Sequence, residues 1–262
     1  MKKANPYETE RYRNEYLLLH YGRDPDRCPR KLIAPRLLRF HERIRKECLL
    51  PIGKRANTRG LDLGCGLGRF TFELGQVVDE VLGIDNSQSF IQAAQQIAKT
   101  GRRSIRVHES GAQFGTREVV LPAQLKNRHV SFRTGDAMDW SRLPRQGYDV
   151  VAAINLICRL PAPRRFLANL HQLVAPGGQL VIASPFTWLP EHTRQREWLT
   201  AQDVRDILEP RFRWVRSREL PFVIREHQRK YQLVFSEVMT FRVRGPAGTK
   251  NKLRRRSGNG AR

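Results

Sequence analysis

Two hydrophobic periodicities alternate along most of the chain. From about Gly60, short apolar runs typical of buried strands are separated by segments whose apolar residues recur at helical spacing. The first strand and helix are "RGLDLGCG" and "GRFTFELGQVV", and the second pair is "EVLGIDN" and "SQSFIQAAQQIAKTG". Strands that alternate with helices are typical of a parallel sheet with helices on both faces. The pattern therefore predicts an α/β fold.

The alternation continues to about residue 243, with one interruption. A polar stretch at about 101–128 follows the second helix, and it is open to interpretation as a lid, a partner surface or a passive excursion. Two strands, a helix, a strand and a further helix come next: "HVSFRTGDA", "YDVVAAINLI", "APRRFLANLHQLV", "GGQLVIASPF" and "TAQDVRDILEP". The last apolar runs, "FRWVRSRELPFVI" and "KYQLVFSEVMTFRV", predict consecutive strands that pair antiparallel at the edge of the sheet.

The two ends of the chain differ from this central region. Residues 1–56 have a mostly helical pattern and predict a cap or lid in front of an α/β domain at 57–243. The segment from Arg242 onward holds eight basic residues and no acidic one. Segments of that composition cannot bury enough apolar surface to fold. Residues 244–262 are therefore predicted to form a disordered basic tail.

Length and composition limit the possible functions. A chain of 262 residues with 40% hydrophobic content can form one large α/β domain with appendages. It has no run of 18 apolar residues and no apolar stretch behind its first lysines, so neither a membrane span nor a secretory signal is expected. The four cysteines lack CxxC spacing, which favours the cytoplasm and argues against a disulfide framework or a zinc site.

The formal net charge of +23 favours, at first sight, a nucleic-acid partner. Part of the excess lies in the tail, and the rest is spread over stretches such as "RLLRFHERIRKE", where arginines sit beside glutamates. We interpret such stretches as solvated helix faces, so a nucleic-acid groove is the weaker alternative. The sequence indicates no particular oligomeric state.

The stretch "LDLGCGLGRF" places Gly64, Gly66 and Gly68 at a junction between a strand and a helix. Glycines let the backbone approach a ligand closely, and a helix N-terminus offers unpaired N–H groups. Asp85 ends the second strand, 21 residues after Gly64, where a carboxylate can accept both hydroxyls of a ribose. Asp136 ends the third strand, where it can contact an adenine amino group. Each acid alone fits a helix cap, but the three signals in order predict a site for an adenosine-containing cofactor.

These motifs, with the turn "PGG" at 176–178 before the fifth strand, resemble those of the class I S-adenosylmethionine-dependent methyltransferases. The resemblance covers about residues 58–243. It implies a Rossmann-like seven-stranded sheet with an antiparallel last strand, a methyltransferase domain over 57–243, and S-adenosylmethionine as the cofactor. The positions expected to bind that cofactor are Asp62, Gly64, Gly66, Gly68, Asp85, Asn86, Asp136, Ala137 and Asn155.

The fifth strand is followed by "SPFTWLPEHTRQREWL" (184–199), which is rich in aromatic and polar side chains. Ligands of open α/β sheets bind beyond the carboxyl ends of the strands, so this segment is expected beside the methyl acceptor. Phe186, Trp188 and His192 would stack on a flat ring, and Thr187 would supply a hydrogen bond. The alternative is a hydrophobic loop that caps the core.

Three segments together resemble a more specific family. "YETERYRNEYLLLHYG" near the N-terminus, "SPFTWLPEHTRQREWL", and "LPFVIREHQRKYQ" near the end occur in the order found in the 4-mercaptohistidine N1-methyltransferases. That family includes the C-terminal methyltransferase domain of bifunctional ovothiol synthases, and the resemblance covers about residues 7–243. It implies methylation of an imidazole nitrogen of 5-thiohistidine (4-mercaptohistidine in other numbering), which gives ovothiol A.

The acceptor implied by this resemblance carries a carboxylate, an ammonium, an ionisable thiol and a ring nitrogen, and its site needs matching cations and polar groups. The residues expected to bind it are Tyr16, His20 and Tyr21 over the ring, Trp188 beside it, and Arg159, Arg225 and Lys230 at the carboxylate or thiolate. The residues expected to act in catalysis are Asn155, Thr187, His192 and Tyr231, of which His192 or Tyr231 would accept a proton if one must leave. The alternatives are core packing for the tyrosines and a hairpin surface for Arg225 and Lys230.

Other functions stay open. An RNA methyltransferase fits the positive charge, but the fourth strand ends in "NLICRL", without the N/D-P-P-Y/F motif or catalytic cysteine pair expected of that class. Another small-molecule N-methyltransferase is also consistent with the motifs. A non-catalytic protein that only binds the cofactor is less favoured, because its glycines and acids would have no reason to remain intact. No metal site is predicted.

Overall fold

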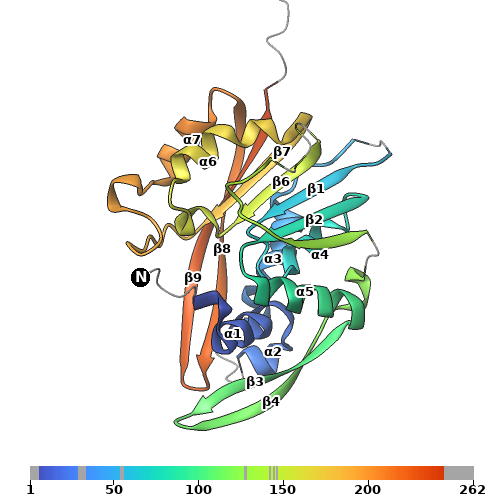
Figure 1. Cartoon of the computed structure of the whole chain (residues 1–262), viewed down its shortest axis with the longest axis vertical. Coiled ribbons are helices and arrows are strands. Elements are labelled where there is room, and N and C mark those ends of the chain that lie inside the picture. Colours follow the sequence, from blue (N-terminus) through green and yellow to red (C-terminus); the bar gives the residue numbers. More distant parts are fainter. Residues whose placement is uncertain are drawn as a thin grey trace, which may run out of the picture.

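The computed structural model describes residues 6–28, 34–53, 56–126, 129–141, 143, 145 and 147–244. Its centre is a seven-stranded sheet in the order β5-β2-β1-β6-β7-β9-β8 (Figure 1). The strands are β1 (Arg59–Leu63), β2 (Glu80–Asp85), β5 (Val130–Thr134), β6 (Tyr148–Ile154), β7 (Val174–Ser184), β8 (Phe212–His227) and β9 (Lys230–Val243). Residues 245–262, which contain nearly all of the predicted basic tail, lie outside the described residues.

Strand directions confirm the expected Rossmann-like methyltransferase fold. β5, β2, β1, β6 and β7 pair in parallel, and β9 is antiparallel to both of its neighbours, β7 and β8. The last strand is therefore the antiparallel one, as predicted. The expected antiparallel pair at the edge of the sheet is also confirmed, with β9 next to β7 and β8 outermost.

Helices cover both faces of this sheet, and alternate residues of one strand contact different layers. Leu180 of β7 packs with Phe166 and Val204, which lie on α6 (Pro163–Asn169) and α7 (Ala201–Leu208). The next residue, Val181, packs with Phe70 of α4 (Arg69–Leu74) on the other side. α5 (Gln88–Thr100) lies beside β5 and β2, and its N-terminus is capped by the Ser87 hydroxyl, which accepts from the Phe90 N–H.

The described part of residues 1–56 is mostly helical, but in short pieces. It contains a 3₁₀ turn (Pro6–Glu8), α1 (Glu10–Tyr21), α2 (Asp24–Arg27), a second 3₁₀ turn (Pro35–Leu38), α3 (Phe40–Arg43) and a π-helical turn (Ile44–Cys48). Among the described residues, no helix is both long and apolar enough to cross a lipid bilayer.

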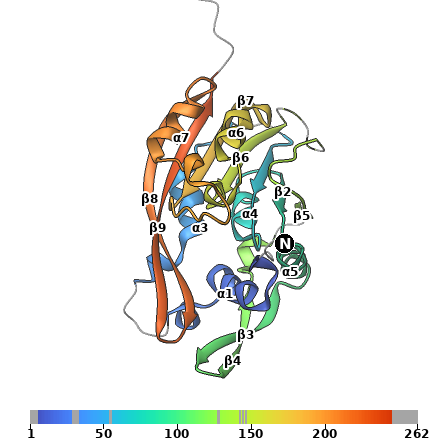
Figure 2. The same ribbon diagram turned by 60° about the vertical axis from the view of Figure 1, so that its left-hand side comes forward.

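The polar stretch after α5 folds as an antiparallel hairpin of β3 (Arg102–Ser110) and β4 (Gln113–Val120). A second projection is made by β8 and β9. The pairing of β7 with β9 ends at Ser184 and Glu237, so residues 220–236 extend beyond the sheet as a two-stranded arm. Figures 1 and 2 both show α1 lying between this arm and the β3–β4 hairpin.

Buried charges join the arm, the hairpin and the N-terminal segment. The Arg225 guanidinium on the arm contacts the Glu109 carboxylate on β3 and donates to the Asp26 carbonyl. Arg117 on β4 completes the network, since it lies 2.6 Å from Glu109 and 3.2 Å from the Asp26 carboxylate. The hairpin thus joins the N-terminal helices to the arm, and the three interpretations of residues 101–128 stay open.

Candidate active site

The glycine loop lies where β1 ends and α4 begins. Gly64, Gly66 and Gly68 have φ values of +69°, +54° and +81°, a left-handed conformation that only glycine adopts readily. The N–H groups of Gly64 and Cys65 both donate to the Ile84 carbonyl, at 2.8 and 2.9 Å. The loop is therefore tied to the end of β2.

The Asp85 carboxylate faces this loop from the end of β2. It accepts from the N–H of Gly66 at 2.8 Å and from the N–H of Ser87 at 2.9 Å. Burial raises its pKa, against the effect of these backbone hydrogen bonds. A carboxylate has about four lone-pair sites, so Asp85 keeps acceptor capacity for two ribose hydroxyls, the contact expected of it. Asn86 follows as an exposed residue at the same corner.

Asp62 on β1 lies below the loop and is fully buried. Its Oδ2 accepts from the Thr71 hydroxyl at 2.7 Å, while Oδ1 has no hydrogen-bond partner within the described part of the chain. Burial is the main reason that its pKa is raised to about 7. A buried acceptor without a donor is costly, and the ammonium of an amino-acid ligand would supply one.

Gly66 has room for a Cβ atom without a clash. A Cβ atom there would lie in ordinary van der Waals contact with His20 Cε1 at 3.8 Å and Phe90 Cδ2 at 3.9 Å. The glycine loop, the unpartnered Asp62 oxygen and the Asp85 carboxylate together fit the methionine and ribose parts of S-adenosylmethionine.

The end of β5 lies beside the end of β2, because the Gly135 N–H donates to the Asp85 carbonyl at 2.9 Å. Asp136 is exposed, and its Oδ1 accepts from the Met138 N–H at 2.8 Å. Ala137 is buried, and its carbonyl accepts from the Trp140 indole at 2.6 Å. Both residues are at the edge where an adenine is expected, and their contacts with it stay a prediction.

Asn155 directly follows β6 and has a left-handed conformation, with φ +56°. Asn is one of the few residues besides glycine that tolerate this region. Its N–H donates to the Ala183 carbonyl at 2.8 Å, and its Oδ1 accepts from the Ser236 hydroxyl at 2.8 Å. The base of the arm therefore orients the Asn155 amide at the carboxyl edge of the sheet.

The aromatic segment after β7 is anchored mainly by its tryptophans. The Trp188 indole donates to the Leu199 carbonyl at 3.0 Å, and the Trp198 indole to the Thr193 carbonyl at 2.9 Å. Trp188 and Phe186 pack against the core beside α6 and α7. Both side chains are only partly buried, so the expected stacking of Trp188 and Phe186 on the acceptor stays a prediction. Phe186 has φ +51°, a strained value for a bulky residue.

Tyr7, Arg159 and His192 come from distant parts of the chain and meet beside the loop that follows β7. The His192 ring lies 6.4 Å from the Tyr7 ring, with their planes 27° apart. Arg159 Nε donates to the Tyr7 hydroxyl at 3.2 Å, and Arg159 Nη1 donates to the Thr187 carbonyl at 2.7 Å. Burial, followed by the charge of Arg159, lowers the pKa of His192, so its imidazole is neutral at neutral pH.

α1 brings Tyr16 and His20 to the same region. The Tyr16 ring lies 5.7 Å from Phe90 and 6.2 Å from His20. His20 is buried against His41, with ring centroids 4.6 Å apart, and burial lowers the pKa of His20 to about 3. The prediction that Tyr21 lies over the acceptor ring needs a correction. Its buried hydroxyl donates to the Leu67 carbonyl at 2.7 Å and so supports the glycine loop.

Three predicted residues lie at the far end of the arm. Tyr231 donates to the Gln228 carbonyl at 3.0 Å, and the exposed Lys230 pairs with Glu226 at 2.9 Å. At about 3.3 Å per residue, the five residues from Ser236 to Tyr231 span roughly 16 Å. Arg225, which pairs with Tyr231, is occupied by Glu109 and Asp26. Arg225 is thus engaged within the chain, and the predicted roles of Arg225, Lys230 and Tyr231 at the acceptor stay predictions.

Sequence reasoning missed Tyr7, His41 and Ser236. Tyr7 belongs to the N-terminal family segment, but only its contacts with Arg159 and His192 distinguish it from the neighbouring tyrosines. Ser236 is one small polar residue in a strand, without a signal of its own in the sequence.

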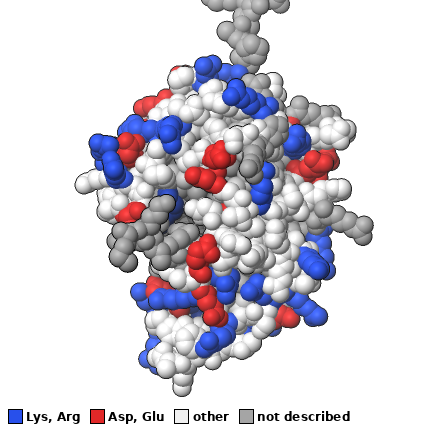
Figure 3. All heavy atoms as spheres, in the orientation of Figure 1, with Lys and Arg blue, Asp and Glu red and all other residues white. Residues whose placement is uncertain are grey.

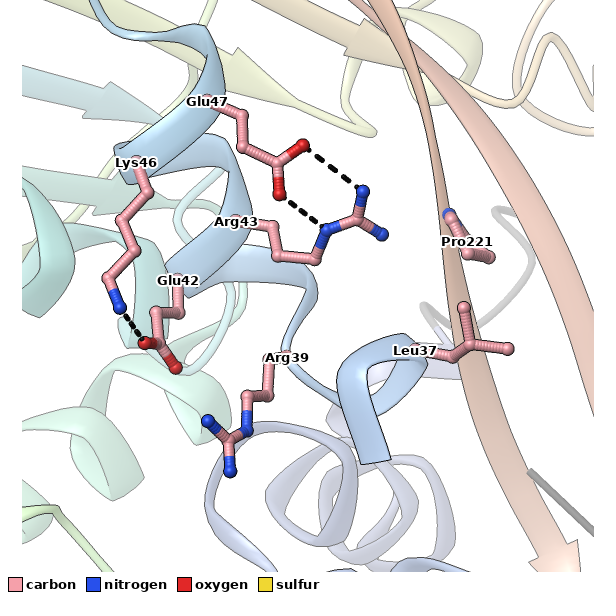
Figure 4. A pocket seen from close by; sticks show the side chains of 7 residues that line it. All are labelled: Leu37, Arg39, Glu42, Arg43, Lys46, Glu47 and Pro221. Atoms are coloured by element: carbon pink, nitrogen blue, oxygen red, sulfur yellow. Dashed lines mark hydrogen bonds and ion pairs between the residues drawn. The ribbon is translucent and has the colours of Figure 1, made fainter. Parts of the chain in front are cut away.

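A groove elsewhere on the molecule is a weaker candidate. It has a volume of about 520 Å³ and lies between α3, the π-helical turn and β8 (Figure 4). Its acidic side chains are paired internally, with Arg43 2.7 Å from Glu47 and Lys46 2.6 Å from Glu42. The lining residues are Leu37, Arg39, Glu42, Arg43, Lys46, Glu47 and Pro221. None of them is a predicted site residue.

Comparison with known proteins agrees with this geometry. The family model of the methyltransferase domain matches residues 30–221, so the chain belongs to that family. A ubiquinone biosynthesis O-methyltransferase from Leptothrix cholodnii is 26% identical over 187 residues, which cover 70% of this chain and 65% of the relative. A demethylmenaquinone methyltransferase from Lactiplantibacillus plantarum is 25% identical over 197 residues, covering 73% and 66%. In both cases the chain spans slightly less than two thirds of the relative's length.

Solved structures show the same fold at lower identity. The N-methyltransferase NodS from Bradyrhizobium japonicum, in complex with S-adenosyl-L-homocysteine, matches with a TM-score of 0.54 and 19% identity over 88% of this chain and 98% of that one. The cyclase SpnF matches with a TM-score of 0.52 and 14% identity, covering 79% and 81%. Family and site together define an S-adenosylmethionine-dependent methyltransferase of class I.

Proposed function

We propose that this enzyme methylates an imidazole nitrogen of 5-thiohistidine and so forms ovothiol A. The observation that carries the proposal is the meeting of Tyr7, Arg159 and His192 beside the loop that follows β7, since Tyr7 and His192 belong to two of the three segments that resemble the family. The guanidinium of Arg159 offers a cation to a carboxylate or thiolate, and the Thr187 carbonyl is an acceptor for an ammonium. Flat aromatic groups beside such polar groups suit a zwitterionic imidazole.

The residues of the chain would act mainly by orientation. S-adenosylmethionine, when bound, supplies an electrophilic methyl group. Holding the acceptor nitrogen in line with that group is worth effective molarities of about 10⁵ M or more. Asn155, fixed by Ser236, and Thr187 are the polar groups proposed to orient the acceptor. Because His192 is neutral at neutral pH, its ring can accept a proton if the attacking nitrogen carries one. A thiol substrate also fits the cytoplasmic location expected from the cysteines.

The test uses the full chain with S-adenosylmethionine and three acceptors: 5-thiohistidine, L-histidine and a bulk RNA. Mass spectrometry is expected to detect an N-methylated product of 5-thiohistidine. Arg159→Met is expected to raise the KM for the acceptor about tenfold or more, while Arg102→Met, a matched loss of an exposed arginine charge on β3, leaves it unchanged. Turnover of RNA without turnover of any imidazole would reject the proposal.

A second candidate is methylation of a phenolic oxygen on a small aromatic ring. It is favoured by the relatives named for ubiquinone and menaquinone biosynthesis. A catechol in the acceptor panel separates the two, because a phenolic product without an imidazole product would favour this candidate. RNA is the weaker alternative. On the face shown in Figure 3, basic side chains are scattered among acidic ones, and no continuous basic track is present there. Salt-sensitive RNA binding that survives deletion of residues 244–262 would favour it.

A further inference from the structure

We infer that the buried Ser236 hydroxyl holds the Asn155 amide with its NH₂ group toward the methyl acceptor, where it binds a proton-free atom such as a thiolate or carboxylate. Asn155 then recognises the acceptor directly, and Ser236 is a positioning residue. The inference rests on the proposed function and deepens it, because it names the kind of atom that the acceptor presents to the end of β6.

The direction of the Asn155 amide follows from the hydroxyl of Ser236. Ser236 is fully buried on β9, and its hydroxyl lies 2.8 Å from Asn155 Oδ1, its one hydrogen-bond partner within the described part of the chain. With the opposite amide orientation, the hydroxyl would accept from Nδ2, and its own proton would be left in the interior without an acceptor. An unpaired buried donor is costly, so the hydroxyl donates to Oδ1.

The NH₂ group of Asn155 is left for a ligand. The oxygen and the nitrogen of an amide point in different directions from one carbon, so an Oδ1 that faces Ser236 turns Nδ2 away from it. Asn155 is half-buried, and Nδ2 has no hydrogen-bond partner among the residues that the structure describes. Unlike the enclosed Oδ1 of Asp62, this nitrogen is also reached by solvent.

The backbone of Asn155 fixes where the NH₂ group lies. Its N–H donates to the Ala183 carbonyl near the end of β7, at 2.8 Å. The next residue, Leu156, packs against Gly64, since a Cβ on Gly64 would lie 2.6 Å from Leu156 Cδ1. Asn155 is therefore held between the glycine loop and the segment that follows β7, where cofactor and acceptor are expected to meet.

Charge and hydrogen bonding agree on the kind of acceptor. An NH₂ group only donates, so it binds an atom with a free lone pair and is a poor match for an ammonium or a protonated amine. Arg159 ends the 3₁₀ turn that follows, with Nη1 2.7 Å from the Thr187 carbonyl, and its guanidinium favours a negative charge nearby. The thiolate and carboxylate of 5-thiohistidine meet both conditions, whereas the exocyclic amine of a nucleobase offers only N–H donors.

The main test is Asn155→Asp, which keeps an oxygen for Ser236 and replaces the NH₂ group with a second oxygen. Asp also tolerates the left-handed backbone. For 5-thiohistidine, kcat/KM is expected to fall about a hundredfold or more, the usual effect of removing one active-site donor. Affinity for S-adenosylhomocysteine, measured by calorimetry, should change less than about twofold.

Two results with Asn155→Asp would overturn the inference. If the amide has the opposite orientation, the variant keeps the oxygen that faces the acceptor, and kcat/KM stays close to that of the wild type. An equal loss of affinity for acceptor and cofactor would instead assign Asn155 to the cofactor.

Ser236→Ala tests the positioning role. It should lower kcat/KM about tenfold, the order expected for one lost hydrogen bond, and should have no further effect in the Asn155→Asp background. The matched control is Thr240→Val, which removes a fully buried hydroxyl of the same strand that donates to the Cys48 carbonyl at 2.8 Å. It should lower stability and leave kcat/KM unchanged. An equal loss by Ser236→Ala in both backgrounds would indicate a purely structural role.

The orientation of the amide is also measurable by NMR without any acceptor. The side-chain NH₂ protons of Asn155 are identified by their absence in Asn155→Asp, or by their shift in Ser236→Ala if that protein fails to fold. They should exchange with solvent as fast as those of an exposed amide. Protection of either proton that is lost in Ser236→Ala would show an NH₂ group bonded to Ser236 and refute the inference. A wild type that methylates no imidazole would reject the proposed function, and this measurement would still decide the orientation.

Discussion

Substitution of two glycines in the same loop separates a packing role from a ligand role. A Cβ on Gly68 would lie 2.4 Å from Phe132 Cε1, at a residue with φ +81°. Phe132 is buried and packs edge-on against Phe72 at 5.4 Å, so it has little room to move. The left-handed backbone costs about 1–2 kcal/mol for a residue with a side chain, and overpacking costs about 1–3 kcal/mol. Gly68→Ala should therefore lower the free energy of unfolding by about 2–5 kcal/mol.

Gly66→Ala is the matched comparison. Its φ of +54° carries a similar backbone cost, but its Cβ meets nothing closer than 3.8 Å. We expect a loss of only about 1–2 kcal/mol in stability, together with a marked loss of cofactor affinity, because Gly66 lies in the loop that is expected to bind the cofactor.

The measurements are urea unfolding of the cofactor-free proteins at neutral pH and calorimetric binding of S-adenosylhomocysteine. Equal destabilisation by the two substitutions would show that Phe132 relaxes and that the steric argument is wrong. Undiminished cofactor binding by Gly66→Ala would show that the cofactor does not contact the position of the added Cβ atom.

Three further predictions concern buried polar groups. Burial raises the pKa of Asp62 to about 7 in the folded protein, well above the value of about 3.9 in the unfolded chain. The stability that this shift contributes is fully present below a pH of about 3.9 and is lost as the pH rises to about 7, by at most about 4 kcal/mol. Asp62→Asn removes this loss. In urea unfolding without cofactor, the stability of Asp62→Asn relative to the wild type should therefore increase from pH 4 to pH 8, and a constant difference would contradict the pKa shift. Arg225→Met should lower the free energy of unfolding by about 3 kcal/mol, because it leaves the Glu109 carboxylate partly uncompensated. The KM for the acceptor should stay unchanged, and a selective rise in that KM would indicate that Arg225 binds the acceptor. Thr193→Val should cost about 1–3 kcal/mol in thermal unfolding, since the Leu160 carbonyl loses its buried donor, and no change would mean that water replaces it.

Much of the cofactor side could be predicted because topology determines it. Parallel strands end at one edge, so residues that directly follow β1, β2 and β6 must lie near one another whatever the details of packing. Gly64, Asp85 and Asn155 each follow or end such a strand, and the structure brings them together.

The acceptor side of the site was harder to predict from the sequence. It depends on distances between segments, and the spacing of apolar residues along the chain does not contain them. β9 alternates in the same way inside and outside the sheet, so its sequence does not indicate that pairing with β7 stops at Glu237. The sequence therefore did not indicate that Lys230 and Tyr231 lie on a two-stranded arm beyond the sheet.

Aromatic composition also left the direction of each ring undetermined. Trp188 packs against the core and His192 faces Tyr7, although the two residues are only four positions apart on one loop. The buried Thr193 hydroxyl fixes which side chains face inward, and its partner, the Leu160 carbonyl, is distant in sequence.

The contact between Asp26 and Arg225 has a consequence for how the molecule is made. The two residues are 199 positions apart in the chain. At about 5–20 residues per second on the ribosome, the N-terminal helices would wait roughly 10–40 s for the arm to emerge. During that interval the strands from β1 to β5 can already associate. The glycine loop and Asp85 would therefore come together before the N-terminal helices are fixed against the arm.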